Sequence, residues 1–242
     1  MHDAQDLFYK EAFWRNKDMI CPKDVQPWTN MFVDKCNGLP IAIVCIGRLL
    51  SFRRRSYLEW EKVYKDIEVQ LTDNSIMDMN IILKVSLEDL PHNMRNFFLY
   101  CCLFPDNYVM QRKSLVRLWM AEGFREEIGQ RASEEVAEDY LTELIHRCLL
   151  VVVKRNDSGC VYEVQMHGIL RVLALSKARE EKFGSVFNPL KAYLVKEVRR
   201  VLTESGDIAQ VAENAPHLRS LLVFQNSFTF DSLRSLSSVN KL

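Results

Sequence analysis

The sequence has little glycine and lacks the glycine-rich loops that cradle phosphate groups. Only eight of its 242 residues are glycine. None of them falls in the pattern Gly-x-x-x-x-Gly-Lys-[Ser/Thr] or in Gly-x-Gly-x-x-Gly. An apolar strand that ends in paired aspartates and could hold Mg²⁺ is missing too. The chain therefore lacks the cradle and the metal site that phosphoryl transfer needs.

Motifs for other kinds of catalysis are also missing. The sequence contains neither Gly-x-Ser-x-Gly nor His-Glu-x-x-His. Its five histidines are scattered, and none stands at zinc-ligand spacing with the cysteines. We therefore expect a protein that is not an enzyme and holds no metal.

Net charge and long apolar runs are lacking as well. The 32 basic residues balance 32 acidic ones, so no overall field favours nucleic acid or an anionic membrane. The longest apolar run, Leu39 to Ile46, is far shorter than the roughly 20 residues of a membrane span. Residues 1–20 carry charges throughout and do not resemble a signal peptide. We expect a cytoplasmic protein without a transmembrane segment.

Seven cysteines are present, an odd number, and no two of them have Cys-x-x-Cys spacing. Several lie in apolar helical runs, where a free cysteine behaves as a small buried hydrophobic residue. This usage fits a reducing compartment better than a framework of disulfides.

Residues 1–88 have the pattern of a helical bundle. Apolar residues recur at helical spacing over 6–14, 25–36, 40–51, 60–71 and 81–90. Gly38 follows one predicted helix and Pro40 begins the next, which is the usual punctuation between two helices. The basic run 53–55 predicts a solvated connector.

Residues 89–185 predict a winged-helix domain. Two helices lie between 94 and 124, joined at 104–107, and a third, amphipathic helix ends near Cys148. Strands at 149–153 and 160–166 flank the turn signal Asn-Asp-Ser-Gly at 156–159 and form the wing. A helix over about 169–181 completes the domain, so the fold class is mainly α with an α+β winged helix.

Residues 186–242 have shorter, strand-like apolar pieces at 197–202 and 218–224. The sequence Leu-Arg-Ser-Leu at 218–221 recurs at 233–236. That offset of 15 residues is shorter than the roughly 20 to 29 residues of leucine-rich repeats. We interpret this region as a linker and the first irregular strands of such a repeat.

Three sequence blocks, in this order, resemble the nucleotide-binding switch of plant disease-resistance receptors of the coiled-coil, leucine-rich-repeat class. The blocks are Gly-Leu-Pro-Ile-Ala at 38–42, Phe-Leu-Tyr-Cys-Cys-Leu-Phe-Pro at 98–105 with Leu-Trp-Met-Ala-Glu-Gly-Phe at 118–124, and Met-His-Gly at 166–168. The resemblance covers most of residues 5–185 and, more loosely, the remainder. It implies the C-terminal part of the switch, with the N-terminal part and its phosphate-binding loop missing.

The resemblance implies two nucleotide-contact residues. In the family, the proline that corresponds to Pro40 packs against adenine, and the histidine that corresponds to His167 contacts the β-phosphate of ADP. From local chemistry alone, Pro40 is an ordinary first-turn proline and His167 a surface or capping histidine. The family has an aspartate that helps to hold the ADP-bound state where this chain has Gly168. Whether Gly168 alters that switch stays open.

The resemblance further implies intracellular pathogen sensing, with ADP/ATP exchange in the complete receptor. We expect this chain alone to bind neither nucleotide tightly. Implied partners are the N-terminal and leucine-rich-repeat domains of a full-length parent, other immune receptors, or pathogen effectors. Two alternatives remain: a winged-helix DNA-binding protein, with basic residues on helix 111–123 and on the wing, and a truncated adaptor without activity of its own.

Overall fold

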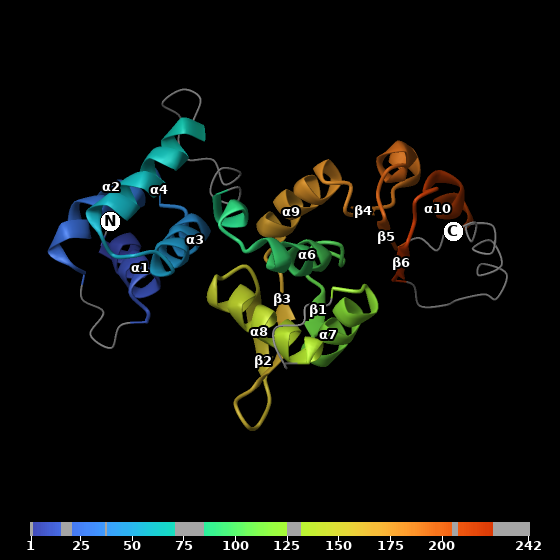
Figure 1. The fold of residues 1–242 in the computed structure, drawn as a ribbon, viewed down its shortest axis with the longest axis horizontal. Helices are drawn as coiled ribbons and strands as arrows, with labels where there is room; N and C mark the ends of the chain where they lie inside the picture. The colour runs from blue at the N-terminus through green and yellow to red at the C-terminus, as the bar shows by residue number, and fades with distance from the viewer. Residues whose placement is uncertain are drawn as a thin grey trace. The chain divides into compact units, whose positions relative to one another are not determined.

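The computed structural model describes residues 2–15, 21–36, 38–70, 85–124, 132–204 and 208–224. In this part the chain is mostly helical with two small sheets, as predicted (Figure 1). The chain divides into two compact units. Unit 1 comprises 1–95 with 142–150, and unit 2 comprises 96–141 with 151–242. The domain boundaries proposed at 88/89 and 185/186 stay predictions.

Unit 1 is built from helices. They are α1 (His2–Ala12), the 3₁₀ turn η1 (Lys23–Val25), α2 (Gln26–Lys35), α3 (Pro40–Ser51) and α4 (Tyr57–Gln70). Gly38 has a φ of +71°, a conformation that glycine adopts without strain between α2 and α3. Of the helix predicted at 81–90, residues 85–88 are helical and 81–84 lie outside the described residues.

Aromatic rings form the core of unit 1. Trp60 on α4 is fully buried and its ring lies 6.2 Å from Phe8, 5.9 Å from Phe13 and 6.2 Å from Phe32. Helix α3 packs closely on α1 at Gly47, where a Cβ atom would stand 2.8 Å from Cβ of Glu11. Glycine is therefore required at this contact, because any larger side chain would push the two helices apart.

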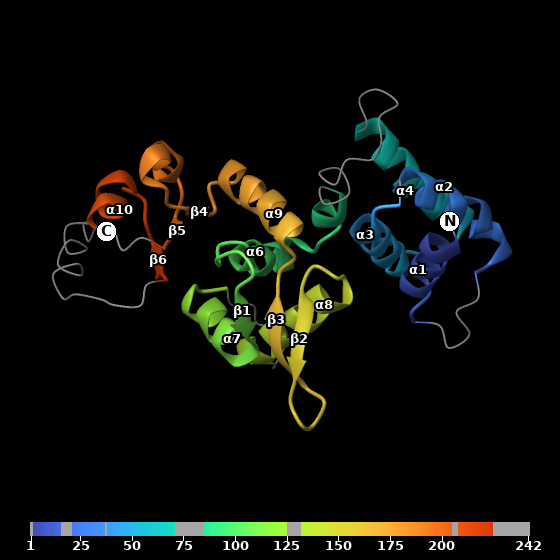
Figure 2. The same ribbon diagram turned by 180° about the vertical axis from the view of Figure 1, so that it is seen from behind.

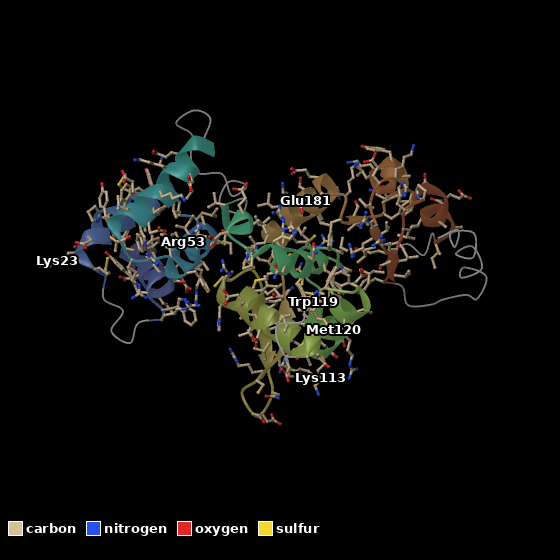
Figure 3. The ribbon with its side chains drawn as sticks, viewed as in Figure 1. Lys23, Arg53, Lys113, Trp119, Met120 and Glu181 are labelled. Atoms are coloured by element: carbon tan, nitrogen blue, oxygen red, sulfur yellow. The ribbon has the colours of Figure 1, made fainter. Side chains whose placement is uncertain are left out.

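Charged groups of unit 1 pair with one another. The guanidinium of Arg48 donates to Glu11 across 2.5 Å and lies over the ring of Trp14. Asp89 accepts from Arg147 across 2.9 Å and also pairs with Arg53, which is labelled in Figure 3. Arg53 is exposed, as the prediction of a solvated connector at 53–55 requires, and it pairs with a residue from a distant part of the sequence.

Unit 2 contains the predicted winged helix. Its elements are α6 (His92–Cys101), which starts in unit 1, then β1 (Val109–Gln111), α7 (Arg112–Ala121), α8 (Ser133–His146), which ends in unit 1, β2 (Val151–Arg155), β3 (Val161–Gln165) and α9 (Gly168–Glu180). The strands β2 and β3 form the antiparallel wing, which projects from the helices in Figure 2. The predicted first strand began two residues early, because Leu149 still bonds back to Leu144.

Strand β1 was not predicted from the sequence. It pairs antiparallel with β3, so the sheet order is β1-β3-β2. Three residues cannot show a clear alternation, and only their pairing with residues 163–165 of β3 makes this segment a strand. The core beside it contains Trp119, fully buried, whose ring lies 5.0 Å from Phe97 in an edge-to-face arrangement.

A second, parallel sheet follows the winged helix in unit 2. It contains β4 (Ser185–Val186), β5 (Arg200–Thr203) and β6 (Ser220–Val223), linked by η2 (Pro189–Val195) and α10 (Ile208–Asn214). Strands β5 and β6 lie inside or close to the predicted ranges, whereas β4 and both helical links were missed. The recurrence at 233–236 lies outside the described residues. Gly184, before β4, comes so close to Leu103 that a Cβ atom there would stand 2.9 Å from it.

Candidate functional site

Pro40 begins helix α3 of unit 1. It occupies the first helical position after Leu39, which is extended and offers no side-chain cap. A proline fits here because its missing N–H would have no partner in the first turn. Pro40 and Leu39 are both exposed, so the ring is available for contact with an apolar surface. The local interpretation of Pro40 as a first-turn proline is confirmed, and its contact with adenine stays a prediction.

His167 stands immediately before helix α9 of unit 2 and caps it. Its Nδ1 atom accepts a hydrogen bond of 3.3 Å from the backbone N–H of Ile169. An imidazole nitrogen that accepts carries no proton, so the proton of the neutral ring is on Nε2. Because His167 is exposed, Nε2 is the atom that can donate to a ligand. The capping role considered for His167 is confirmed.

His167 borders a hollow of about 500 Å³ on the surface of unit 2. The start of β2, the end of β3, the start of α9 and the turn before β1 all contribute to its wall. The lining residues are Asn107, Val151, Gln165, Met166, His167, Gly168 and Ile169. Gln165 and Asn107 are within 3.5 Å of each other, so two amide groups and one imidazole face a partly apolar space.

Gly168 makes room for a carboxylate from another segment. A Cβ atom built on Gly168 would stand 3.2 Å from Oδ1 of Asp106, which lies in the turn before β1. Asp106 also accepts from the amide of Asn107 across 3.3 Å. A negative charge therefore lies next to the first turn of α9, where the helix dipole favours it. The absence of an aspartate at 168 does not leave this helix start without a carboxylate.

Asp106, Asn107 and Gln165 were not among the residues predicted for the site. The turn 104–107 was recognised from its sequence, but nothing local indicates that it contacts the start of α9. The pairing of β1 with β3 brings the turn there, and β1 was itself missed. Recognising that the wing sheet has a third strand, β1, would have placed this turn beside the start of α9.

The hollow offers hydrogen-bond donors to a nucleotide. His167 offers a donor for a phosphate oxygen, and the amides of Asn107 and Gln165 offer further polar contacts. Among the described residues that line it, however, there is neither lysine nor arginine to balance the phosphate charge. Pro40 lies in unit 1 and His167 in unit 2. The expectation that this chain alone binds ADP only weakly stays a prediction.

The basic residues considered for DNA binding are partly engaged within unit 2. Arg112 on α7 donates to Glu138 across 2.5 Å. On the wing, Arg155 donates to the carbonyl of Gly159 across 2.9 Å and Lys154 lies over the ring of Tyr162. The inner face of α7 is buried at Leu115, Val116 and Trp119. Lys113 and Arg117 on the same helix are exposed, so the DNA-binding alternative stays a prediction.

No helix in the described ranges is long and apolar enough to cross a membrane. Within the same ranges, no three or more side chains of His, Cys, Asp or Glu gather to hold a metal ion.

Residues 103–174 match the family described as Disease resistance protein Winged helix domain. The chain is 34% identical over 234 residues to Disease resistance protein RPM1 of Arabidopsis thaliana, covering 96% of this chain and 24% of that protein. It is 36% identical over 186 residues to Putative disease resistance RPP13-like protein 3 of the same plant, covering 77% of this chain and 21% of that protein.

A relative from the same plant, Disease resistance RPP8-like protein 3, is 33% identical over 239 residues, with 91% of this chain and 26% of that protein covered. The chain thus spans about a quarter of the length of these curated relatives. The matched winged helix includes the turn at 104–107, the wing and His167.

Proposed function

Because the chain belongs to the plant disease-resistance proteins and carries their winged-helix domain, we propose that it forms the C-terminal part of an ADP/ATP-dependent switch in an intracellular immune receptor. In this proposal the chain has no catalytic activity. Its winged helix supplies one wall of a nucleotide site whose phosphate cradle belongs to the preceding part of a full-length receptor. The partners are then the other domains of that receptor.

The observation that carries this proposal is the cap formed by His167. The hydrogen bond from Ile169 to Nδ1 holds the ring at the start of α9 and leaves Nε2 as the outward donor. A donor held in place loses little freedom when it binds a phosphate oxygen. Such a contact would favour the nucleotide state in which the phosphate lies beside α9, so His167 can couple the nucleotide to the position of the winged helix.

Pro40 would supply an apolar contact of a different kind. Its ring is exposed at the start of α3 and its backbone angle is set by the ring itself. Packing of such a ring on the flat face of a base needs no hydrogen bond. We therefore expect Pro40 to contribute affinity for the base and His167 to contribute sensitivity to the phosphates.

The parallel sheet that follows the winged helix supports the start of a leucine-rich repeat. Arg200 of β5 pairs with Ser220 of β6, twenty positions further along the chain. A strand spacing of this size falls at the lower end of leucine-rich repeats, which is about 20 to 29 residues. The helix α10 links the two strands, as a repeat unit of one strand and one helical segment requires.

The test is ADP binding to the complete receptor that contains this chain, obtained by extending the native transcript upstream of residue 1. We expect His167→Ala to weaken ADP binding by about tenfold or more, since it removes a hydrogen bond to a charged group. His92→Ala, which removes an exposed histidine that does not line the hollow at His167, is the control and should leave the affinity unchanged. Isothermal titration with ADP measures both.

The 242-residue chain alone should show no ADP binding at micromolar concentrations that depends on His167. Tight binding by this chain that is lost in His167→Ala would refute the need for an external phosphate cradle, and unchanged affinity of the complete receptor in His167→Ala would refute the role of His167. If the native transcript encodes only these 242 residues, the switch proposal fails and an adaptor that acts through other receptors takes its place.

A further inference from the structure

A second hollow in unit 2, of about 690 Å³, is lined mainly by basic residues. We call it the arginine groove. Its wall comes from Asn96 on α6, the segment after α9, and the starts of β5 and β6. The lining residues are Asn96, Glu181, Lys182, Phe183, Glu197, Arg199, Arg200, His217 and Arg219. Glu181, labelled in Figure 3, marks the end of α9 at its rim.

Two of the cations in the arginine groove are already neutralised. Arg200 is buried and its Nε donates to Glu122 across 2.6 Å, while its guanidinium lies 4.3 Å from the ring centre of Phe183. Lys182 pairs with Glu197 across 2.6 Å at the exposed edge. The ion pair and the cation–π contact together fix the buried side chain of Arg200 in the wall of the groove.

Arg199 and Arg219 form a pair of like charges. The backbone N–H of Arg219 donates to the carbonyl of Arg199 across 2.7 Å, and the following residues continue in register as parallel strands. Both side chains are exposed and both line the same groove. Among the described residues, neither has an acidic partner. Like charges placed side by side on neighbouring strands are destabilising unless an anion joins them.

The size and the donors of the groove indicate the class of anion. A volume of about 690 Å³ lies within the range of small-molecule sites, about 300 to 1,000 Å³. Guanidinium groups present paired N–H donors that match the oxygens of phosphate. His217 and Asn96 add donors from two other segments of the wall. Convergence of donors from several sides suits a compact ligand with several oxygens better than an extended acidic peptide.

We propose that the arginine groove binds a small polyanion that carries phosphate groups, with Arg199 and Arg219 clamping one phosphate between them. Such a ligand would join the starts of β5 and β6 to the end of α9. It would thereby stabilise the connection between the winged helix and the parallel sheet. This site is separate from the hollow at His167 and does not depend on nucleotide binding there.

The test uses the 242-residue chain with inorganic tripolyphosphate as the probe, measured by isothermal titration at about 0.15 M ionic strength. We expect the double variant Arg199→Ala/Arg219→Ala to lose at least about tenfold in affinity, because two charged hydrogen-bond donors are removed. Lys113→Ala/Arg117→Ala is the matched control. It removes two exposed cations from α7, which do not line the groove, and should bind as the wild type does.

Thermal unfolding with and without tripolyphosphate checks that both variants fold. The wild type and the control should gain stability with the probe, and the groove variant should not. Sedimentation with phosphatidylcholine vesicles that contain phosphatidic acid tells whether the phosphate can belong to a lipid headgroup or must be free in solution.

Three outcomes would overturn the proposal. The first is no binding of tripolyphosphate to the wild type. The second is an equal loss in the groove variant and in the control, which would mean non-specific attraction by total charge. The third is tighter binding of a polyglutamate peptide than of tripolyphosphate, which would assign the groove to an acidic polypeptide instead.

Discussion

Unit 1 and unit 2 each enclose a fully buried tryptophan in a cluster of aromatic rings, yet they place their charged groups differently. In unit 1, Arg48 pairs with Glu11 and Arg147 pairs with Asp89, and both guanidinium groups lie over aromatic rings. Unit 2 has a buried pair of the same kind, Arg200 with Glu122, and in addition it places His167 and Arg199 at hollows. Both units therefore use charge internally, and unit 2 also presents polar and charged groups for contact.

The two aromatic cores can be broken one at a time. Trp60→Ala in unit 1 and Trp119→Ala in unit 2 should each cost about 3 to 5 kcal/mol of unfolding free energy, because each leaves a large cavity. Amide hydrogen exchange should show the loss of protection in α1–α4 for the first variant and in α6–α8 for the second. Equal loss across both units in either variant would show one cooperative core and contradict the division into two.

A negative charge can be added to the polar surface of unit 2 at position 168. Gly168→Asp would place a second carboxylate beside Asp106, so the helix dipole would favour it and Asp106 would oppose it. We expect an unfavourable coupling of about 0.5 to 1 kcal/mol between Asp106 and the new aspartate, measured by a double-mutant cycle with Asp106→Asn.

Gly168→Asn serves as the uncharged control in that cycle and should show little coupling to Asp106. The coupling should also shrink at high salt, because both groups are exposed. A zero or favourable coupling at low salt would mean that Asp106 turns away when a side chain occupies position 168.

The smallest of the expected effects is a pH dependence of the unfolding free energy that comes from His146 in unit 1. Burial lowers the pKa of His146, whose ring lies 5.0 Å from that of Trp14, and the nearby Arg15 and Arg48 lower the pKa further while Glu143 opposes them. The unfolded chain then binds a proton more readily than the folded one. The stabilisation is present above about pH 6.5 and is lost as the pH falls from there through the folded-state pKa.

Chemical unfolding at several pH values between about 5 and 8 measures this effect. His146→Gln should remove the part of the slope that belongs to the histidine and should match the wild-type slope at the alkaline end. An unchanged slope in the variant would show that His146 is not responsible.

Much of the fold could be predicted from the sequence because its signals are local. Gly38 and Pro40 mark the break between two helices, and the turn at 156–159 marks the wing, since glycine and proline set backbone angles by themselves. Strands β1 and β4 were missed because they are too short to show a pattern. The ion pair of Arg53 was not predicted because its acidic partner, Asp89, is remote in the sequence.

The candidate site also has features that the sequence predicted and features that it did not. The positions of Pro40 at a first turn and of His167 at a cap follow from residue type and helix boundaries, and both are as expected. The surroundings of His167 could not be predicted. The amides of Asn107 and Gln165 meet although 58 positions separate them, and this requires the pairing of β1 with β3.

The sequence by itself determined most of the helices and the wing, because periodicity and turn residues are properties of neighbouring residues. Only the tertiary structure decided that Glu11 leaves room for nothing but glycine at 47, that Asp106 lies against Gly168, and that Arg199 and Arg219 stand side by side. Each of these contacts joins segments that are far apart in the chain. Such contacts depend on packing and strand pairing, which no local pattern records.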